Sequence, residues 1–357
     1  MSAAELLALA MLVALTAYVL TAGADFGGGV WDLLAAGPRR DRQRALVAHA
    51  IGPIWEANHV WLILVVVVLF TCFPVAYAAL SVALHVPLTL ALVGIVMRGA
   101  AFAFRSTFSG GGAEERGWGR VFSVASTVTP VLLGMCVGAV ATGRVPEALR
   151  LARGGGSFAD AYLRPWLSPF TVAVGLLALA LFALLAAAYL CVEAEEDDLR
   201  EDFRRRALGA WVAAAGLAVV ALALARLDRA HVGAALTRSA MALPLHLATA
   251  AASLAALWGL VGRRWRFARA AVAAQAVLVL WGWALAQRPY LVPPDMTVQG
   301  AAAPPRTLAL TLGALAVGAV VLVPSLWYLF AVFKSGAPGR RAGSGSRRAA
   351  APGPPAP

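Results

Sequence analysis

Long apolar runs alternate along the chain with short segments that hold most of the charged residues. Nine runs are each long enough to cross about 30 Å of hydrocarbon as a helix. Transmembrane strands would alternate apolar and polar residues over about ten positions, and these runs do not. The pattern therefore predicts an all-α polytopic membrane protein with about nine transmembrane helices. The runs cover residues 4–34, 55–73, 78–102, 121–142, 167–192, 208–225, 240–261, 268–286 and 307–333.

Composition supports this class. Hydrophobic residues make up 61% of the chain and charged residues only 13%, whereas about a quarter of a soluble domain is charged. The first run has no basic segment before it and is too long for a cleavable signal peptide, so we expect a retained helix. The net charge of +12 comes mainly from arginines between the runs. Such arginines are topology signals, and we expect no nucleic-acid partner.

The distribution of basic residues predicts the orientation. Nine spans put the two termini on opposite sides of the membrane. One set of connections holds 21 of the 30 Lys and Arg residues, and the opposite set holds the other nine. By the positive-inside rule, the richer set is cytoplasmic, so the N-terminus is outside and the C-terminus inside. The richer set covers residues 39–44, 98–120, 200–206, 263–269 and 334–348.

The last residues differ in composition from the rest. Residues 336–357 are rich in Pro, Gly, Ala, Ser and Arg and offer no apolar face to bury, so we expect a disordered cytoplasmic tail after a membrane domain of residues 1–335. The mixed acidic and basic stretch at 193–206 is interpreted as a solvated cytoplasmic connection.

Two carboxylates fall at the edges of apolar runs. Asp25 lies near the end of the first run and Glu56 near the start of the second. A charge at membrane depth costs roughly 2.5 to 3.5 kcal/mol on insertion scales, so it usually faces a bundle interior and has a task. The predicted topology puts both in the cytoplasmic half. Glycines at 23 and 27–29 surround Asp25 and would let another helix, a water or a ligand approach closely.

Each carboxylate also has a purely structural interpretation. Asp25 could cap a helix or pair near its end with Arg98 or with an arginine of the first connection. Glu56 follows Pro53 and would suit the dipole of a first helical turn. The functional hypothesis is proton exchange by both residues.

Histidine and tryptophan raise the question of a cofactor. His59, His85 and His246 lie within spans, but a lone histidine in an apolar helix is more often a packing residue than a haem ligand. We expect no haem and no metal bound by this chain alone. Trp55 and Trp61 flank Glu56, the carboxylate of the second span. Each of them could be a packing residue or could lie beside a cofactor or quinone.

Four segments carry a family resemblance. Residues 52–62 read Gly-Pro-Ile-Trp-Glu-Ala-Asn-His-Val-Trp-Leu, which strongly resembles the second-helix signature of subunit II of cytochrome bd quinol oxidases, Gly-Pro-x-Trp-Asp/Glu-Gly-Asn-x-Val-Trp-Leu. Asp25-Phe26-Gly27, the run at 97–102 followed by Arg105, and the Pro-Pro-Asp-Met-Thr-Val loop at 293–298 also agree. The match extends from the first span to the last.

The resemblance implies a function. In that family, subunit II carries no haem and pairs with a subunit I that holds b haems, a d haem and the quinol site. The complex lies in the bacterial cytoplasmic membrane, oxidises quinol and reduces dioxygen to water with protons from the cytoplasm. Subunit II is thought to supply part of the proton path. The resemblance assigns Asp25 and Glu56 to that relay, with supporting positions at His59, Asn58, Trp55, Trp61 and Arg98.

The chain departs from the family pattern at several positions. An acidic residue common in relatives is Ala103 here, and one that some relatives carry is Ala22. The motif glycine is Ala57, and His59 replaces an acidic or amide residue. A relay would then use water or His59 where a carboxylate is missing. The rival functions are a proton-coupled secondary transporter and a purely structural scaffold for subunit I. The sequence leaves open whether a lipid, a quinone or a small single-helix accessory subunit joins the complex.

Overall fold

The computed structural model describes the backbone of residues 1–107, 113–228 and 230–335, and the side chains of these residues except 51–57, 105–116, 238, 323, 326–327 and 329–335. The chain divides into two compact units, Met1–Thr311 and Leu312–Pro357. The described part of the second unit continues the last helix. The predicted tail at 336–357 lies outside the described residues.

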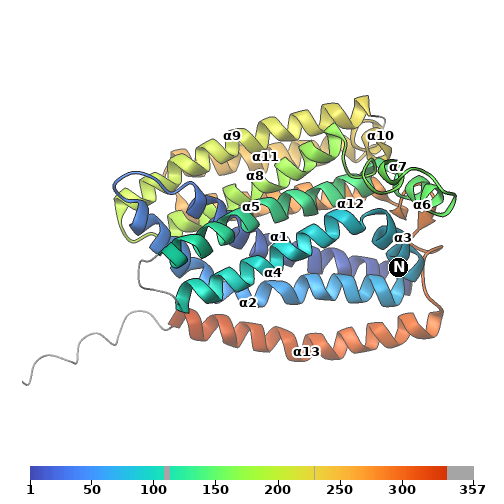
Figure 1. Ribbon diagram of the computed structural model, residues 1–357, viewed down its shortest axis with the longest axis horizontal. Helices are drawn as coiled ribbons and strands as arrows, with labels where there is room; N and C mark the ends of the chain where they lie inside the picture. Colours follow the sequence, from blue (N-terminus) through green and yellow to red (C-terminus); the bar gives the residue numbers. More distant parts are fainter. Residues whose placement is uncertain (108–112, 229, 336–357) are drawn as a thin grey trace, which may run out of the picture. The chain divides into compact units, whose positions relative to one another are not determined.

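Helices account for nearly all of the described chain, as predicted (Figure 1). Only one two-stranded antiparallel sheet is found among the described residues, in the connection before the last helix. The elements are α1 (Ala3–Leu33), α2 (Arg40–Cys72), α3 (Pro74–Ala83), α4 (His85–Thr107), α5 (Ala113–Thr142), α6 (Val145–Arg153), α7 (Phe158–Tyr162), α8 (Pro169–Glu193), α9 (Asp197–Leu227), α10 (His231–Arg238), α11 (Ala242–Val261), α12 (Trp265–Gln287), β1 (Tyr290–Val292), β2 (Met296–Thr297) and α13 (Pro305–Ser335).

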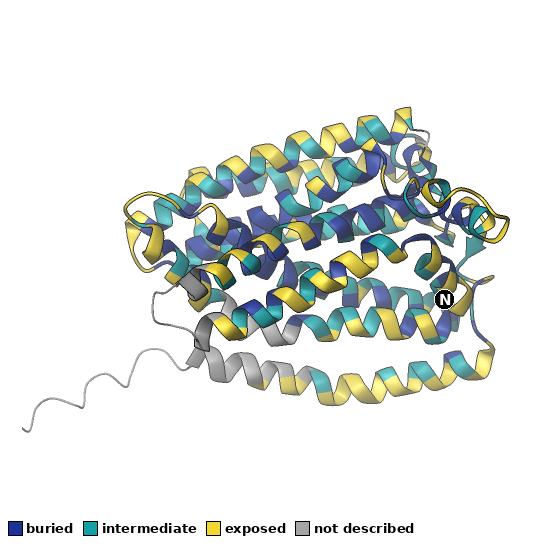
Figure 2. Cartoon of the chain, in the orientation of Figure 1, coloured by how far each residue is buried: buried dark blue, intermediate teal, exposed yellow. Residues whose placement is uncertain are grey.

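The core of the first unit forms around α8, which packs against α1, α5 and α9. Buried residues concentrate on these central helices (Figure 2). Small residues permit the close packing: a Cβ on Gly134 of α5 would lie 2.8 Å from Cα of Gly175 in α8. Trp31 of α1 also donates its indole N–H to the carbonyl of Ala183 in α8 at 2.8 Å. Close backbone approach and interhelical hydrogen bonds are the usual basis of helix packing in membranes.

Eight described helices are long and apolar enough to span a membrane, or up to nine if a bent pair counts as one span. The bent pair joins the end of α2, Asn58–Cys72, to α3 across an angle of 117°. The prediction of about nine spans is confirmed at this level, and the chain is a multi-pass membrane protein.

The single span predicted at 78–102 was wrong in its boundaries. The chain breaks at Leu84, and α4 begins at His85. Pro87 explains the break, because it has no N–H to donate to the carbonyl four residues earlier. The first part of the predicted span belongs to the short helix α3.

Two further boundaries differ from the prediction. α2 begins at Arg40, well before the predicted start at residue 55, so Glu56 is not in a first helical turn. The helix-dipole interpretation of Glu56 was therefore wrong. α9 begins at Asp197 and includes most of the stretch predicted as a connection. Acidic side chains at its start favour a helix N-terminus, which explains the extension.

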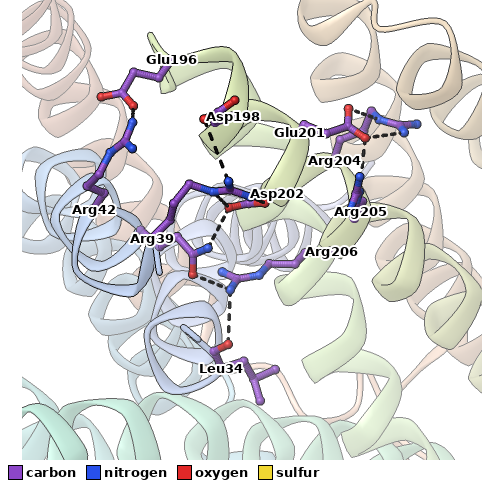
Figure 3. A network of polar contacts seen from close by, with 11 residues as sticks. Leu34, Arg39, Arg42, Glu196, Asp198, Glu201, Asp202, Arg204, Arg205 and Arg206 are labelled. Carbon is purple, nitrogen blue, oxygen red and sulfur yellow. Dashed lines mark hydrogen bonds and ion pairs between the residues drawn. The ribbon is translucent and has the colours of Figure 1, made fainter. Parts of the chain in front are cut away.

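At one end of the first unit, polar side chains join the start of α2 to the start of α9 (Figure 3). Arg39 donates to both carboxylate oxygens of Asp202, at 2.7 and 2.6 Å, and Gln43 donates to the same group at 2.9 Å. Arg206 donates to the side chain of Gln43 at 2.7 Å and to the carbonyl of Leu34 at 3.2 Å. We call these five residues the arginine clamp.

The other end has contacts of its own. Arg144 donates to Asp228 at 2.5 Å, and Gln299 donates to Ser2 at 2.6 Å. In both groups, the connections that touch are ones predicted to share a side of the membrane. This agreement supports the predicted alternation of the spans.

The break between α2 and α3 also holds a distant connection in place. α2 ends at Cys72, and the carbonyl of Cys72 accepts a hydrogen bond from the N–H of Ala303 at 2.8 Å. Ala303 lies two residues before α13. The start of the last helix is thus tied to the end of the second.

Candidate functional site

Asp25 lies in the middle of the core, with 1% of its surface exposed. A Cβ on Gly27 would lie 2.0 Å from the carbonyl oxygen of Phe182 in α8, and one on Gly29 would lie 2.2 Å from Cβ of Ser126 in α5. Glycine is therefore required at both positions for α8 and α5 to approach α1. The predicted function of the glycines around Asp25, close approach by other helices, is confirmed.

Two other helices bring polar groups to this carboxylate, and a third holds one of them. Arg98 of α4 forms a buried ion pair with Asp25, and Asn58 of α2 donates to its other oxygen at 2.9 Å. Arg98 also donates through Nε to the hydroxyl of Ser126 at 2.9 Å, and its guanidinium lies 4.8 Å from the centre of the Phe26 ring. Sequence analysis named Asp25, Asn58 and Arg98 separately, and the structure brings the three together.

The ion pair has an energetic consequence. Breaking a buried pair by removing one partner costs about 3 to 5 kcal/mol, because the other charge stays buried without compensation. Pairing with Arg98 was the structural alternative for Asp25, and this contact is present. Any proton that reaches Asp25 arrives beside a fixed positive charge.

Two buried polar atoms near the pair have no hydrogen-bond partner among the described residues. They are Oδ1 of Asn58 and Oγ1 of Thr129. Thr129 lies one turn after Ser126 on α5 and faces Gly94 of α4. Buried polar atoms of this kind are usually satisfied by ordered water. The surroundings of Asp25 thus offer polar positions that a proton route could use.

A second buried carboxylate, Asp32, lies seven residues after Asp25 on α1, with 1% of its surface exposed. Ser123 of α5 donates to its Oδ2 at 2.7 Å. Nε of Arg44 lies 3.8 Å from its Oδ1, and the same guanidinium donates to the Asp32 carbonyl at 3.3 Å. Sequence analysis missed this group. The spacing of seven residues between two acids, and of three between Ser123 and Ser126, could have revealed a shared helix face.

The remaining predicted site residues follow α2. Glu56 and Trp55 come two and three residues before Asn58, and their side chains lie outside the described residues. Because Asn58 contacts Asp25, this part of α2 passes beside the carboxylate. His59 is half-buried, and Trp61 packs against the core. Packing is the observed role of Trp61.

Two of the histidines within spans make local contacts. Nδ1 of His85 lies 3.0 Å from the carbonyl of Val82, and Nδ1 of His246 lies 2.5 Å from that of Ala242. Among the described residues, no group of three or more His, Cys, Asp or Glu side chains could hold a metal ion.

A largely apolar cavity of about 540 Å³ lies between α1, α5 and the helices from α8 to α12. Tyr18, His246, Gln275 and Trp283 are among its polar lining residues. Oε1 of Gln275 and Nε1 of Trp283 are buried without a partner among the described residues. Its size and its few polar groups are typical of a site for a small apolar molecule.

Comparison with known proteins gives concordant results. The profile of the family described as cytochrome bd terminal oxidase subunit II matches residues 3–333. The cytochrome bd-I ubiquinol oxidase subunit 2 of Escherichia coli strain K12 is 29% identical over 185 residues, which cover 50% of this chain and 45% of the relative. That alignment therefore spans less than half of the relative.

A Bacillus subtilis protein described provisionally as a cytochrome bd menaquinol oxidase subunit II is 23% identical over 323 residues, covering 88% of this chain and 91% of the relative. Among solved structures, a chain of the bd oxidase from Geobacillus thermodenitrificans matches with a TM-score of 0.74 at 20% identity. This match covers 94% of this chain and all of the other. At that identity the structural match establishes the fold alone. The profile match covers nearly the whole chain, and the chain therefore belongs to the cytochrome bd terminal oxidase subunit II family.

Proposed function

We propose that this chain is the non-haem subunit of a bacterial quinol oxidase that reduces dioxygen to water. Its partner would be a subunit I that holds haem b and haem d and oxidises quinol in the cytoplasmic membrane. Family membership over residues 3–333 is the observation that carries this proposal. Family membership over residues 3–333 also favours the oxidase over the rival hypothesis of a proton-coupled transporter.

We propose that the connection between α1 and α2 faces the cytoplasm, with the N-terminus outside and residues 336–357 forming a cytoplasmic tail. The excess of basic residues in one set of connections supports this orientation. The contacts between connections support the alternation of the spans, but they do not identify which side is cytoplasmic. Accessibility of single cysteines placed in the connections to a membrane-impermeant reagent would test the orientation.

The task proposed for this chain is to pass cytoplasmic protons toward the partner's oxygen-reducing site. Asp25 would hold a proton in transit, with Asn58 next to it and Glu56 further along α2. Water or His59 would take the place of the carboxylate that relatives carry where this chain has Ala103. Arg98 orients Asp25 and compensates its charge, and the polar atoms on α2 and α5 offer positions for the water that would link the residues.

A first experiment tests the assembly. The complex is isolated by a tag on this chain, and its optical spectrum and oxygen consumption with quinol are measured. We expect a second large subunit, haem absorbance and quinol-dependent oxygen consumption. Isolation of a single colourless subunit from membranes that respire normally would contradict the proposal.

A second experiment tests the proton task. Asp25→Asn should lower oxygen consumption about a hundredfold or more, because a positioned proton-transfer group contributes roughly 10²- to 10⁴-fold. If this variant does not assemble, the double variant Asp25→Asn/Arg98→Met removes both charges together and keeps the pair neutral. Normal turnover of either variant with full haem content would rule out the relay through Asp25.

We also propose that the apolar cavity takes the chain of an isoprenoid quinone or of a lipid. Its volume of about 540 Å³ and its few polar groups support this role. Mass spectrometry of the purified complex, with Ala276→Phe to reduce the cavity, tests it. Unchanged lipid and quinone content in that variant would contradict the proposal.

A further inference from the structure

Asp32 is a buried carboxylate to which the proton route proposed above assigns no role. Only 1% of its surface is exposed, and its Oδ2 accepts a hydrogen bond from Ser123 at 2.7 Å. A buried charge is unfavourable unless neighbouring groups compensate it. An ionisable residue at membrane depth therefore usually has a functional role. The contacts of Asp32 indicate which task this is.

Ser123 can serve both protonation states of this carboxylate. Its Oγ lies 2.7 Å from Oδ2 of Asp32 and 2.9 Å from the carbonyl of Gly119. A hydroxyl has one proton to donate and two lone pairs that accept. When Asp32 is ionised, Ser123 donates to it; when Asp32 is protonated, it donates to Ser123, which then donates to Gly119. Asp32 therefore keeps a hydrogen-bonded partner with and without a proton.

Arg44 connects Asp32 to the surface. Its side chain is 27% exposed, whereas that of Asp32 is 2% exposed. The guanidinium lies 3.8 Å from Oδ1 and is held by the Asp32 carbonyl. The positive charge compensates the buried carboxylate, and the exposed part of Arg44 lies at the end of the first unit that carries the arginine clamp. The carboxylate is thus one side chain away from solvent.

On the other side, Asp32 is aligned with Asp25. Seven residues separate them on α1, which is two helical turns or about 10 Å along the axis. The serines of α5 run beside this interval: Ser123 contacts Asp32, and Ser126 accepts from Arg98, the ion-pair partner of Asp25. Gly29 lies between the two acids, and only a glycine leaves room for Ser126 there. Polar side chains therefore follow one another from Arg44 to Asp25, and one helical turn of α5 separates the contacts of Ser123 from those of Ser126.

We propose that Asp32 collects protons at the Arg44 end of this series of side chains and supplies them to Asp25; the proposal rests on the function proposed above. A proton leaves hydronium in the bulk water, which becomes water, and binds an oxygen of Asp32. Asp32 then releases it to water beside the serines of α5, the O–H bond breaking as the carboxylate re-forms; this water becomes hydronium and gives a proton to Asp25. No charge other than the proton moves, and no oxidant is needed.

The test uses the whole complex, isolated by a tag on this chain. Asp32→Asn keeps the size of the side chain and its acceptor for Ser123 but cannot carry a proton. We expect oxygen consumption with saturating quinol to fall about a hundredfold, haem content to stay unchanged, and the ratio of rates in H2O and D2O to rise. Asp32→Glu should restore most of the rate. Asp202→Asn, in the arginine clamp, is the matched control and should leave the isotope ratio unchanged.

The outcomes separate this inference from the proposed function. Normal turnover and isotope ratio in Asp32→Asn, with low turnover in Asp25→Asn, would overturn the role of Asp32 and leave the route through Asp25 intact. Normal turnover in both variants would overturn the route itself. If Asp32→Asn does not assemble, Ser123→Ala removes the acceptor that the protonated carboxyl needs, and an unchanged isotope ratio there would overturn the inference.

Discussion

Replacement of Arg98 by methionine should destabilise the protein by leaving Asp25 as a buried charge without its partner. Methionine keeps most of the length of the side chain but none of its donors. Arg98 is 1% exposed and makes an ion pair with Asp25 and a hydrogen bond with Ser126. An uncompensated buried charge costs about 3 to 5 kcal/mol. The contact of the guanidinium with the Phe26 ring adds about 1 kcal/mol.

The double variant Asp25→Asn/Arg98→Met measures how much the ion pair itself contributes to the free energy of unfolding. Both charges are then absent, and Asn58 keeps an acceptor at position 25. We expect the double variant to lie within about 2 kcal/mol of the native protein, because replacing a whole buried pair by neutral groups is often close to neutral. If each single variant costs about 3 to 5 kcal/mol and the double variant at most about 2 kcal/mol, the coupling between the two positions should be at least about 4 kcal/mol.

The assay is denaturant-induced unfolding of the purified complex in detergent, followed by far-ultraviolet circular dichroism for the native protein, both single variants and the double variant. The expected order of stability is native, double variant, then the singles. Two results would refute this reasoning: Arg98→Met unfolds at the same denaturant concentration as the native protein, or the double variant is no more stable than the single variants.

Two further predictions follow from close contacts. Gly27→Ala should cost about 3 kcal/mol or more and reduce the yield of assembled complex, because its Cβ would lie 2.0 Å from a backbone carbonyl of α8; Gly209→Ala, where a Cβ meets nothing within 4 Å, is the control, and equal yields would contradict the prediction. Asp202→Ala should lower the free energy of unfolding by about 1 to 2 kcal/mol, because it removes the acceptor of Arg39 and Gln43. Arg39 is partly exposed, so this loss should become smaller in concentrated salt. A loss that does not depend on salt would show that packing, not charge, holds the clamp.

Sequence alone predicted the class of fold because hydrophobicity over twenty residues is a strong signal and a membrane leaves few alternatives. Helix boundaries were harder. The start of α2 at Arg40 lies in a polar stretch, where hydropathy gives no sign of a helix. The break at Leu84 lies inside an apolar run, and only the position of Pro87 marks it.

The candidate site was predicted in part. Asp25, Asn58 and Arg98 stood out as polar residues in apolar or motif-bearing segments, but their contact depends on how α1, α2 and α4 pack. Asp32 was overlooked because it lies next to a polar connection, where an acid is unremarked in sequence. Its burial comes from the approach of α5, which no local pattern encodes.

The hydrogen bond between Cys72 and Ala303 also bears on the order in which the chain can be built. The carbonyl at the end of α2 is synthesised more than two hundred residues before the N–H that satisfies it. Until that late segment emerges, water or another temporary donor must occupy the carbonyl. The bend after α2 therefore stays incomplete through most of synthesis, and the segment before α13 closes it. In a protein truncated before Ala303, the backbone amides at the α2–α3 junction should consequently lose protection from hydrogen exchange, although they lie far from the cut in sequence.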